Sequence, residues 1–360
     1  DRPKSSCSRT AKIGGCSLML FGVHPLAAYA VVGLGAAAYS PAKYGILTEY
    51  LPSRLLVVAN GWIEGLTVGA IILGTLVGGL LIKPAIAQSL LGFDFPLIET
   101  GIDTVPEMAL CVVGVLYILA ALFNLKVPDT GVDHKALKSN PIYLLHDFNH
   151  CLRLLWRDKL GQISLATTTL FWGAGGNLKF IVLAWAAVAL GYNTTQASAL
   201  TGVVAIGTAV GAVVASMRMR LDMATKVIPL GIAMGLLLIL MVFISNIWVA
   251  IPFLIILGGL GGYLVVPMNA LLQHRGHNLM GAGRSIAVQN FNEQACILAL
   301  GAFYSLSLKF GLSVFGAITA FGLVVAGVMW LIQRWHQNNC VQHRDEVEHL
   351  LHIARHDTHH

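Results

Sequence analysis

The sequence predicts an all-α integral membrane protein, a bundle of helices that cross the membrane, and three observations support this. Hydrophobic residues make up 56% of the 360 residues and charged residues only 11%, with a mean hydropathy of +0.73. Soluble domains carry about 25% charged residues. Uncharged stretches long enough to cross a bilayer recur along the chain, and a motif near the start returns in its last third.

The expected helices follow from the uncharged stretches and from the polar turns that divide them. A spanning helix needs roughly 20 mostly apolar residues, because the hydrocarbon core is about 30 Å thick. Ten spans are expected: two before Glu49, then 53–82, 105–126, a helix ending near Leu190, one ending near 217 after the break GYNTTQ, two within 227–273 divided at Ser245 and Asn246, 278–308 and 312–334.

The placement of lysine and arginine predicts which loops face the cytoplasm, since cytoplasmic loops collect these residues. Both chain ends and alternate loops are basic, whereas the loop 83–107 on the other side is largely acidic. We therefore expect a multi-pass membrane protein with both ends of this chain in the cytoplasm. The net charge of +6 then reflects topology and attraction to anionic lipid, and no nucleic-acid partner is expected.

An internal repeat organises the spans into two halves. The stretch GLGAAAYSPAKYGIL from Gly33 aligns with GLGGYLVVPMNALLQ from Gly259, which places Lys43 opposite Asn269. In the helix that follows each stretch, Glu64 falls opposite Glu293. The repeated stretch and the helix after it form a pair of helices. In the second half of the chain this pair is the fourth and fifth of six expected helices, whereas in the first half it is the second and third of four. The repeat therefore predicts that two further helices belong at the N-terminus.

Four regions follow from this plan. Residues 1–126 are expected to form the N-terminal half-bundle, with four of six helices, and 159–335 the six-helix C-terminal half-bundle. Residues 127–158 are expected to be a cytoplasmic linker whose segment from Pro141 is an amphipathic helix at the membrane interface. Residues 336–360 are expected to be a histidine-rich cytoplasmic tail. A parallel repeat of this kind is typical of transporters of the major facilitator type.

Charged and amide residues inside the spans are the candidate functional residues. A charge at the centre of a spanning helix costs about 2.5–3.5 kcal/mol on insertion scales, so those retained usually face a cavity or a partner. Glu64 and Glu293 are expected near mid-bilayer, where they either line a pathway or hold helices together. Lys43 either binds an anion or extends to the cytoplasmic headgroups. Lys179 follows the glycines of FWGAGGNLKF, which predicts a loosened helix that borders a cavity.

Other chemistry finds less support in the sequence. The six cysteines form no C-x-x-C pair, so neither a zinc site nor a disulfide framework is predicted, and no cofactor or metal is expected. A membrane-embedded acyltransferase would need a histidine–aspartate or similar acid–base pair, and none of the 13 histidines lies in a credible one. No catalytic residue is therefore predicted, and the protein is not expected to be an enzyme.

Several segments resemble the bacterial lysophospholipid transporter family of the major facilitator superfamily. The resemblance lies in GAAAYSPAKYGIL, ANGWIEG, LFWGAGGNLKFIVLAW, VVPMNALLQHRG and GAGRSIAVQNFNE, and it runs from about residue 1 to about 335. It implies a twelve-helix fold of which this chain holds ten. It also implies a location in the bacterial inner membrane and inward movement of lysophosphatidylethanolamine and lysophosphatidylglycerol across it. An acyl-carrier-protein-dependent acyltransferase would then reacylate these lipids in the cytoplasm.

The residues are compatible with this substrate, and two alternatives stay open. Lys43 and Lys179 suit the phosphate of a lysophospholipid, Glu64 or Glu293 suits its ammonium group, and Asn269 adds a hydrogen-bonding group. The same features suit an exporter of amphipathic drugs or metabolites. A non-transporting fragment is the second alternative, because the repeat predicts helices that this chain lacks.

Overall fold

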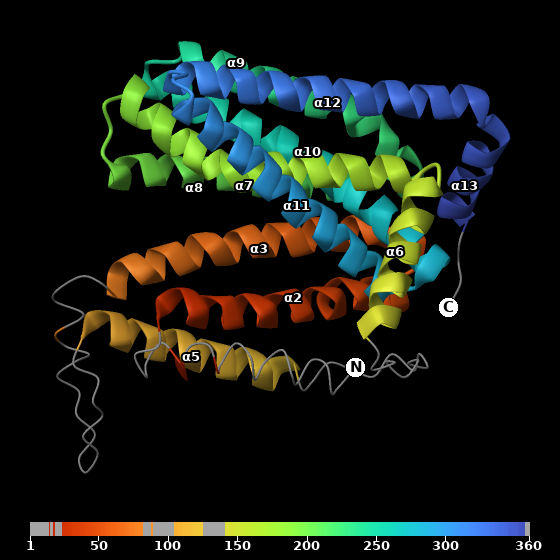
Figure 1. Ribbon diagram of the computed structural model, residues 1–360, viewed down its shortest axis with the longest axis horizontal. Coiled ribbons are helices and arrows are strands. Elements are labelled where there is room, and N and C mark those ends of the chain that lie inside the picture. Colours follow the sequence, from red (N-terminus) through yellow and green to blue (C-terminus); the bar gives the residue numbers. More distant parts are fainter. Residues whose placement is uncertain are drawn as a thin grey trace. The chain divides into compact units, whose positions relative to one another are not determined.

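The computed structural model describes Gly14, Ser17, Leu18, Gln88 and residues 24–81, 104–124 and 141–356 (Figure 1). Within these residues the regular structure is helical, and no strand occurs. The helices are α2 Pro25–Tyr50, α3 Ser53–Leu81, α5 Val105–Asn124, α6 Pro141–Arg157, α7 Gly161–Ala189, α8 Thr194–Arg218, η1 Leu221–Val227, α9 Ile228–Leu240, η2 Met241–Phe243, α10 Ile247–Met280, α11 Ala282–Lys309, α12 Val314–Gln342 and α13 Arg344–His356.

The chain divides into two compact units, which are described separately below. The first comprises Asp1–Ile46 and Ala70–Ala136, and the second comprises Leu47–Gly69 and Leu137–His360. The second unit therefore contains the beginning of α3 together with α6 to α13. The division of the chain into two half-bundles at 126 and 159 remains a prediction from the repeat.

Most expected helix boundaries lie within a few residues of those observed, but α10 continues to Met280 and α12 to Gln342, beyond the expected ends at 273 and 334. The polar segments predicted to separate spans contain helix caps: Asn193 accepts a hydrogen bond of 2.9 Å from the backbone N–H of Gln196, and Asn246 accepts one of 2.9 Å from that of Trp248. Such caps satisfy N–H groups that have no partner within the helix. The breaks at GYNTTQ and at Ser245–Asn246 are therefore confirmed.

The predicted count of ten spans is only partly matched. Six helices in the described residues are long and apolar enough to cross a membrane, namely Ser53–Gly74, Gly161–Ala189, Gln196–Arg218, Leu221–Phe243, Ile247–Met280 and Val314–Gln342. Shorter apolar helices cover Leu26–Ala37 and Glu107–Phe123. Of the two spans expected before Glu49, the described residues contain α2, and the first falls mainly outside them.

Helix α11 matches the predicted span at 278–308, but its composition is more polar than that of the six. It has 28 residues, about 42 Å at 1.5 Å per residue, which exceeds the hydrocarbon thickness. Its amide and acidic side chains lower its hydropathy, namely Gln289, Asn290, Asn292, Glu293 and Gln294. A spanning-length helix with this many polar residues is the natural place to look for a functional site.

Glycines bring α8 and α10 into direct backbone contact within the second unit. A Cβ at Gly207 or Gly211 of α8 would collide with the backbone of α10, and a Cβ at Gly258 or Gly262 of α10 would collide with that of α8. Small residues at four-residue spacing allow such close approach between membrane helices. These two pairs are therefore packing features, as their spacing predicts.

Two amphipathic helices lie beside this packed bundle. Helix α6 is joined to α11 by an ion pair of 3.1 Å between Asp147 and Arg284 and by an edge-to-face contact between Phe148 and Phe291. Helix α13 buries Val347, Leu350 and Ala354 and contacts η1. The expected tail therefore contains a helix folded back onto the bundle, held in addition by Arg355 hydrogen-bonding to Asp222 at 2.7 and 3.0 Å.

Candidate substrate-binding site

Helices α10 and α11 share a buried row of polar side chains. Gln289 donates one hydrogen bond of 2.9 Å to the amide oxygen of Asn269 and another of 2.7 Å to a carboxylate oxygen of Glu293. All three side chains are buried. A carboxylate held in apolar surroundings needs such donors, because an isolated buried charge is strongly disfavoured. Of the predicted site residues, Asn269 and Glu293 are thus brought together, with Gln289 between them.

Glu64 of α3 is a second buried carboxylate of the second unit. It is 4% exposed, and Glu293 is 8% exposed. These are the two carboxylates that the repeat aligned. Both also follow an amide by four residues, since Asn60 precedes Glu64 as Gln289 precedes Glu293. Four residues is close to one helical turn, so each amide and its carboxylate share a helix face.

Lys179 lies elsewhere, on an exposed part of α7. Its ammonium nitrogen is 4.8 Å from the centroid of the neighbouring Phe180 ring, within the range of a cation–π contact. Asn177, two residues earlier, is buried and donates hydrogen bonds to the carbonyl oxygens of Gly173 at 2.8 Å and Ile297 at 3.0 Å. Lys179 therefore stands just beyond a tight contact between α7 and α11.

The glycines before Lys179 do not loosen the helix, contrary to the sequence-based expectation. Helix α7 is continuous from Gly161 to Ala189. A Cβ at Gly173 would collide with Cys296 of α11, and one at Gly176 would come within 3.1 Å of Ile297. These two glycines therefore allow close packing of α7 on α11, which is a structural use that the same pattern also predicts.

Lys43 lies on α2 in the first compact unit, whereas its repeat counterpart Asn269 lies in the second. Its side chain is half-buried, and its ammonium nitrogen is 4.8 Å from the centroid of the Tyr44 ring. Among the predicted site residues, Lys43 is thus the one described within the first unit.

Sequence reasoning missed three buried amides that the structure brings into or beside the site: Asn60, Gln273 and Gln289. The signal that could have found them is the four-residue spacing of polar residues, which occurs three times, at Asn60 and Glu64, at Asn269 and Gln273, and at Gln289 and Glu293. Two polar residues on one helix face in an otherwise apolar helix mark a face that meets protein rather than lipid.

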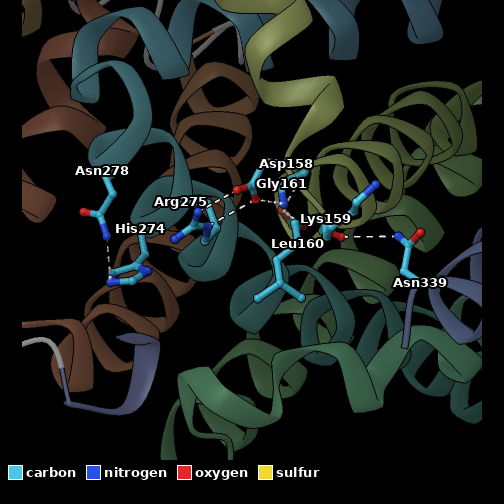
Figure 2. A network of polar contacts seen from close by, with 9 residues as sticks. Asp158, Lys159, Leu160, Gly161, His274, Arg275, Asn278 and Asn339 are labelled. Carbon is cyan, nitrogen blue, oxygen red and sulfur yellow. Dashed lines mark hydrogen bonds and ion pairs between the residues drawn. The ribbon is translucent and has the colours of Figure 1, made fainter. Parts of the chain in front are cut away.

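A second polar network lies at the end of the bundle where α7 begins and α10 ends (Figure 2). Asp158 accepts hydrogen bonds of 3.1 and 2.5 Å from the guanidinium of Arg275, and one of 2.7 Å from the backbone N–H of Gly161. Nearby, Asn339 donates to the carbonyl oxygen of Lys159 at 3.5 Å. This network fixes the start of α7 against α10 and α12, and it is distinct from the row around Glu293.

Comparison with known proteins places the chain in a family. Residues 13–299 match the model of the Major Facilitator Superfamily. The lysophospholipid transporter LplT of Serratia proteamaculans (strain 568) is 38% identical over 327 residues, which cover 90% of this chain and 77% of that protein. The lysophospholipid transporter LplT of Yersinia pestis (strain Pestoides F) is 38% identical over 301 residues, covering 83% and 69%.

Solved structures agree in fold. The transporter FucP in its outward conformation superposes with a TM-score of 0.63 at 13% identity, over 92% of this chain and 80% of that one. A bacterial homologue of the iron transporter ferroportin, in an outward-facing state, gives 0.61 at 13% identity, over 94% and 83%. The chain belongs to the Major Facilitator Superfamily and, within it, to the lysophospholipid transporter family.

Proposed function

We propose that this protein carries lysophospholipids, namely lysophosphatidylethanolamine and lysophosphatidylglycerol, inward across the bacterial inner membrane. The observation that carries the proposal is the 38% identity, along 90% of the chain, to a protein named as a lysophospholipid transporter. An aligned stretch of 327 of the 360 residues spans the helices that hold the polar row.

The headgroup chemistry fits the buried polar residues. A lysophospholipid headgroup carries a phosphate and, in the ethanolamine form, an ammonium group. Glu293 and Glu64, which are both buried, offer negative charge to the ammonium group. Asn269 and Gln289 offer hydrogen bonds to phosphate or glycerol oxygens, and amides suit both because they donate and accept.

The lysines supply the opposite charge. A phosphate in a low-dielectric site needs a cation, since charge-assisted hydrogen bonds are roughly twice as strong as neutral ones. Lys179, which is exposed on α7, is the candidate in the second unit, and Lys43 is the candidate in the first. We propose that they meet the phosphate at different stages of its passage.

The direction and the partner complete the proposal. The inward direction is what the resemblance to the lysophospholipid transporter family implies. The basic residues at alternate loops support a topology in which both chain ends are cytoplasmic. Lysophospholipid delivered to the inner leaflet needs one acyl chain to become a diacyl lipid again. An acyl-carrier-protein-dependent acyltransferase is therefore proposed as the functional partner.

The experiment is uptake of labelled lysolipid into spheroplasts that produce the protein, measured separately for the ethanolamine and glycerol headgroups. We expect saturable uptake of both, with label appearing in diacyl lipid. An amphipathic dye serves as the competing substrate. Energy-dependent extrusion of the dye without lysolipid uptake would instead support an exporter.

A further inference from the structure

Asn60 of α3 and Gln273 of α10 form a reciprocal amide pair. The amide nitrogen of Asn60 donates to the amide oxygen of Gln273 at 2.9 Å, and the amide nitrogen of Gln273 donates back at 3.0 Å. The two side chains are 0% and 2% exposed. The second amide hydrogen of Asn60 is bound by the carbonyl oxygen of Leu56 at 2.9 Å. Both amide hydrogens and the amide oxygen of Asn60 are therefore hydrogen-bonded, but only while α3 and α10 keep this register.

The pair lies on one side of the polar row, toward the basic end of the helices. Asn60 stands between Arg54 and Glu64 on α3, and Gln273 stands between Asn269 and Arg275 on α10. On each helix the amide is one turn from a site residue and on the same face. If the polar row binds substrate, as proposed above, a substrate moving from it toward the basic end passes this level.

A contact next to the amide pair, between Gly61 of α3 and α8, shows how closely these two helices approach each other. A Cβ at Gly61 would collide with the Ser216 side chain of α8 and come within 3.0 Å of the Ala212 carbonyl oxygen. Helix α3 belongs to the first half of the repeat, and α8 and α10 belong to the second. The two halves of the repeat are thus in direct contact at this level, with no side chain at Gly61 to separate them.

We propose that Asn60 and Gln273 form a latch that closes the cytoplasmic end of the pathway and separates each time substrate is released inward. Transporters of this plan work by rocking one repeat against the other. The proposal rests on the proposed transport. When the two halves are together, each amide makes hydrogen bonds with the other. When the halves separate, water makes hydrogen bonds with both amides instead. An amide pair thus holds the closed state without resisting an open, hydrated one.

The test measures access from the cytoplasmic side and needs no substrate. A reporter cysteine replaces Val266, which is buried and lies seven residues before Gln273, hence on the same face of α10 two turns deeper. The native cysteines are replaced by serine or alanine. Inside-out vesicles are treated with a charged maleimide, and the labelling rate of the reporter is compared among variants.

Three variants decide the outcome. Asn60→Leu leaves the Gln273 amide buried without its partner in the closed state, so labelling is expected to rise at least fivefold. The double variant Asn60→Leu with Gln273→Met leaves neither amide in place. Its labelling rate is expected to return to within twofold of the rate measured when both amides are present. Asn177→Leu removes a buried amide that joins α7 and α11 inside one half, so labelling is expected to stay unchanged.

Two results would overturn the latch. One is equal labelling with and without Asn60→Leu, and the other is an equal rise in the Asn177→Leu control, which would indicate general loosening. Because the readout is independent of lysolipid, a functioning latch in a protein without lysolipid uptake would refute the proposed substrate alone. Lysolipid uptake with an unchanged labelling rate would refute the latch alone.

Discussion

Arg275 and Asp158 form a buried, two-point ion pair that joins the last turns of α10 to the turn before α7. Their side chains are 6% and 7% exposed, and the guanidinium nitrogens lie 3.1 and 2.5 Å from the two carboxylate oxygens. Removing one member of such a pair is costly, because the other charge stays buried without its partner.

Arg275→Met is therefore expected to lower the free energy of unfolding by about 3–5 kcal/mol. Thermal unfolding in detergent, followed by intrinsic fluorescence, measures the effect. Arg344→Met is the matched control, because it breaks an ion pair of 2.7 Å with Glu348 that is open to solvent. The control should keep the melting temperature of the unchanged protein, and equal losses in the two variants would show that burial of the pair is unimportant.

The sign of the charge at position 179 should matter more than the shape of the side chain. Lys179→Arg keeps a cation for the phosphate and is expected to retain lysolipid uptake, whereas Lys179→Glu would repel the phosphate and abolish it. Uptake at matched protein levels in spheroplasts is the measurement. Similar uptake by the two variants would remove Lys179 from the binding site.

Lys43 and its repeat counterpart Asn269 allow a comparison of the two halves. If Lys43 binds the phosphate, Lys43→Gln should sharply reduce uptake of lysophosphatidylglycerol, while membrane insertion and thermal stability stay nearly unchanged. Asn269→Gln keeps an amide and should have a milder effect. A lysine that only anchors the helix in anionic lipid contributes about 1 kcal/mol, so normal uptake by Lys43→Gln would identify it as an anchor.

The two sides of the membrane can be distinguished by labelling introduced cysteines. The basic loops predict that a cysteine near Asp94 reacts with an impermeant maleimide added outside whole cells, and that one near Lys135 does not. Both positions fall outside the residues that the structure describes. The opposite labelling pattern would invert the topology and place the proposed latch on the outer side.

Much of the helical plan could be predicted from the sequence, because hydrocarbon thickness and charge placement act on local composition. The breaks capped by Asn193 and Asn246 are of this kind. The burial of both Glu64 and Glu293 agrees with the repeat, which placed them at the same depth. Partners across helices were harder to predict, because the pairing of Asn60 with Gln273 depends on how α3 and α10 are rotated, and composition carries no information on rotation.

The glycines before Lys179 show that one sequence pattern can be compatible with two different structures. Three glycines near a charge are compatible with a loosened helix and with a tight helix contact. The choice depends on which residue lies opposite, here Cys296 and Ile297 of α11. Likewise, the folding of α13 back onto the bundle depends on the ion pair between its Arg355 and Asp222 of η1. These two residues are far apart in the sequence.

The central claim is that this chain itself moves lysophospholipid, and proteoliposomes test it most directly. Purified protein is reconstituted with a fluorescent lysophosphatidylethanolamine, and a membrane-impermeant quencher reports how much of it reaches the protected leaflet. We predict protein-dependent, saturable transfer that unlabelled lysophosphatidylethanolamine competes for and that Lys179→Glu abolishes. Transfer no faster than in protein-free liposomes, or equal transfer by Lys179→Glu, would contradict the account.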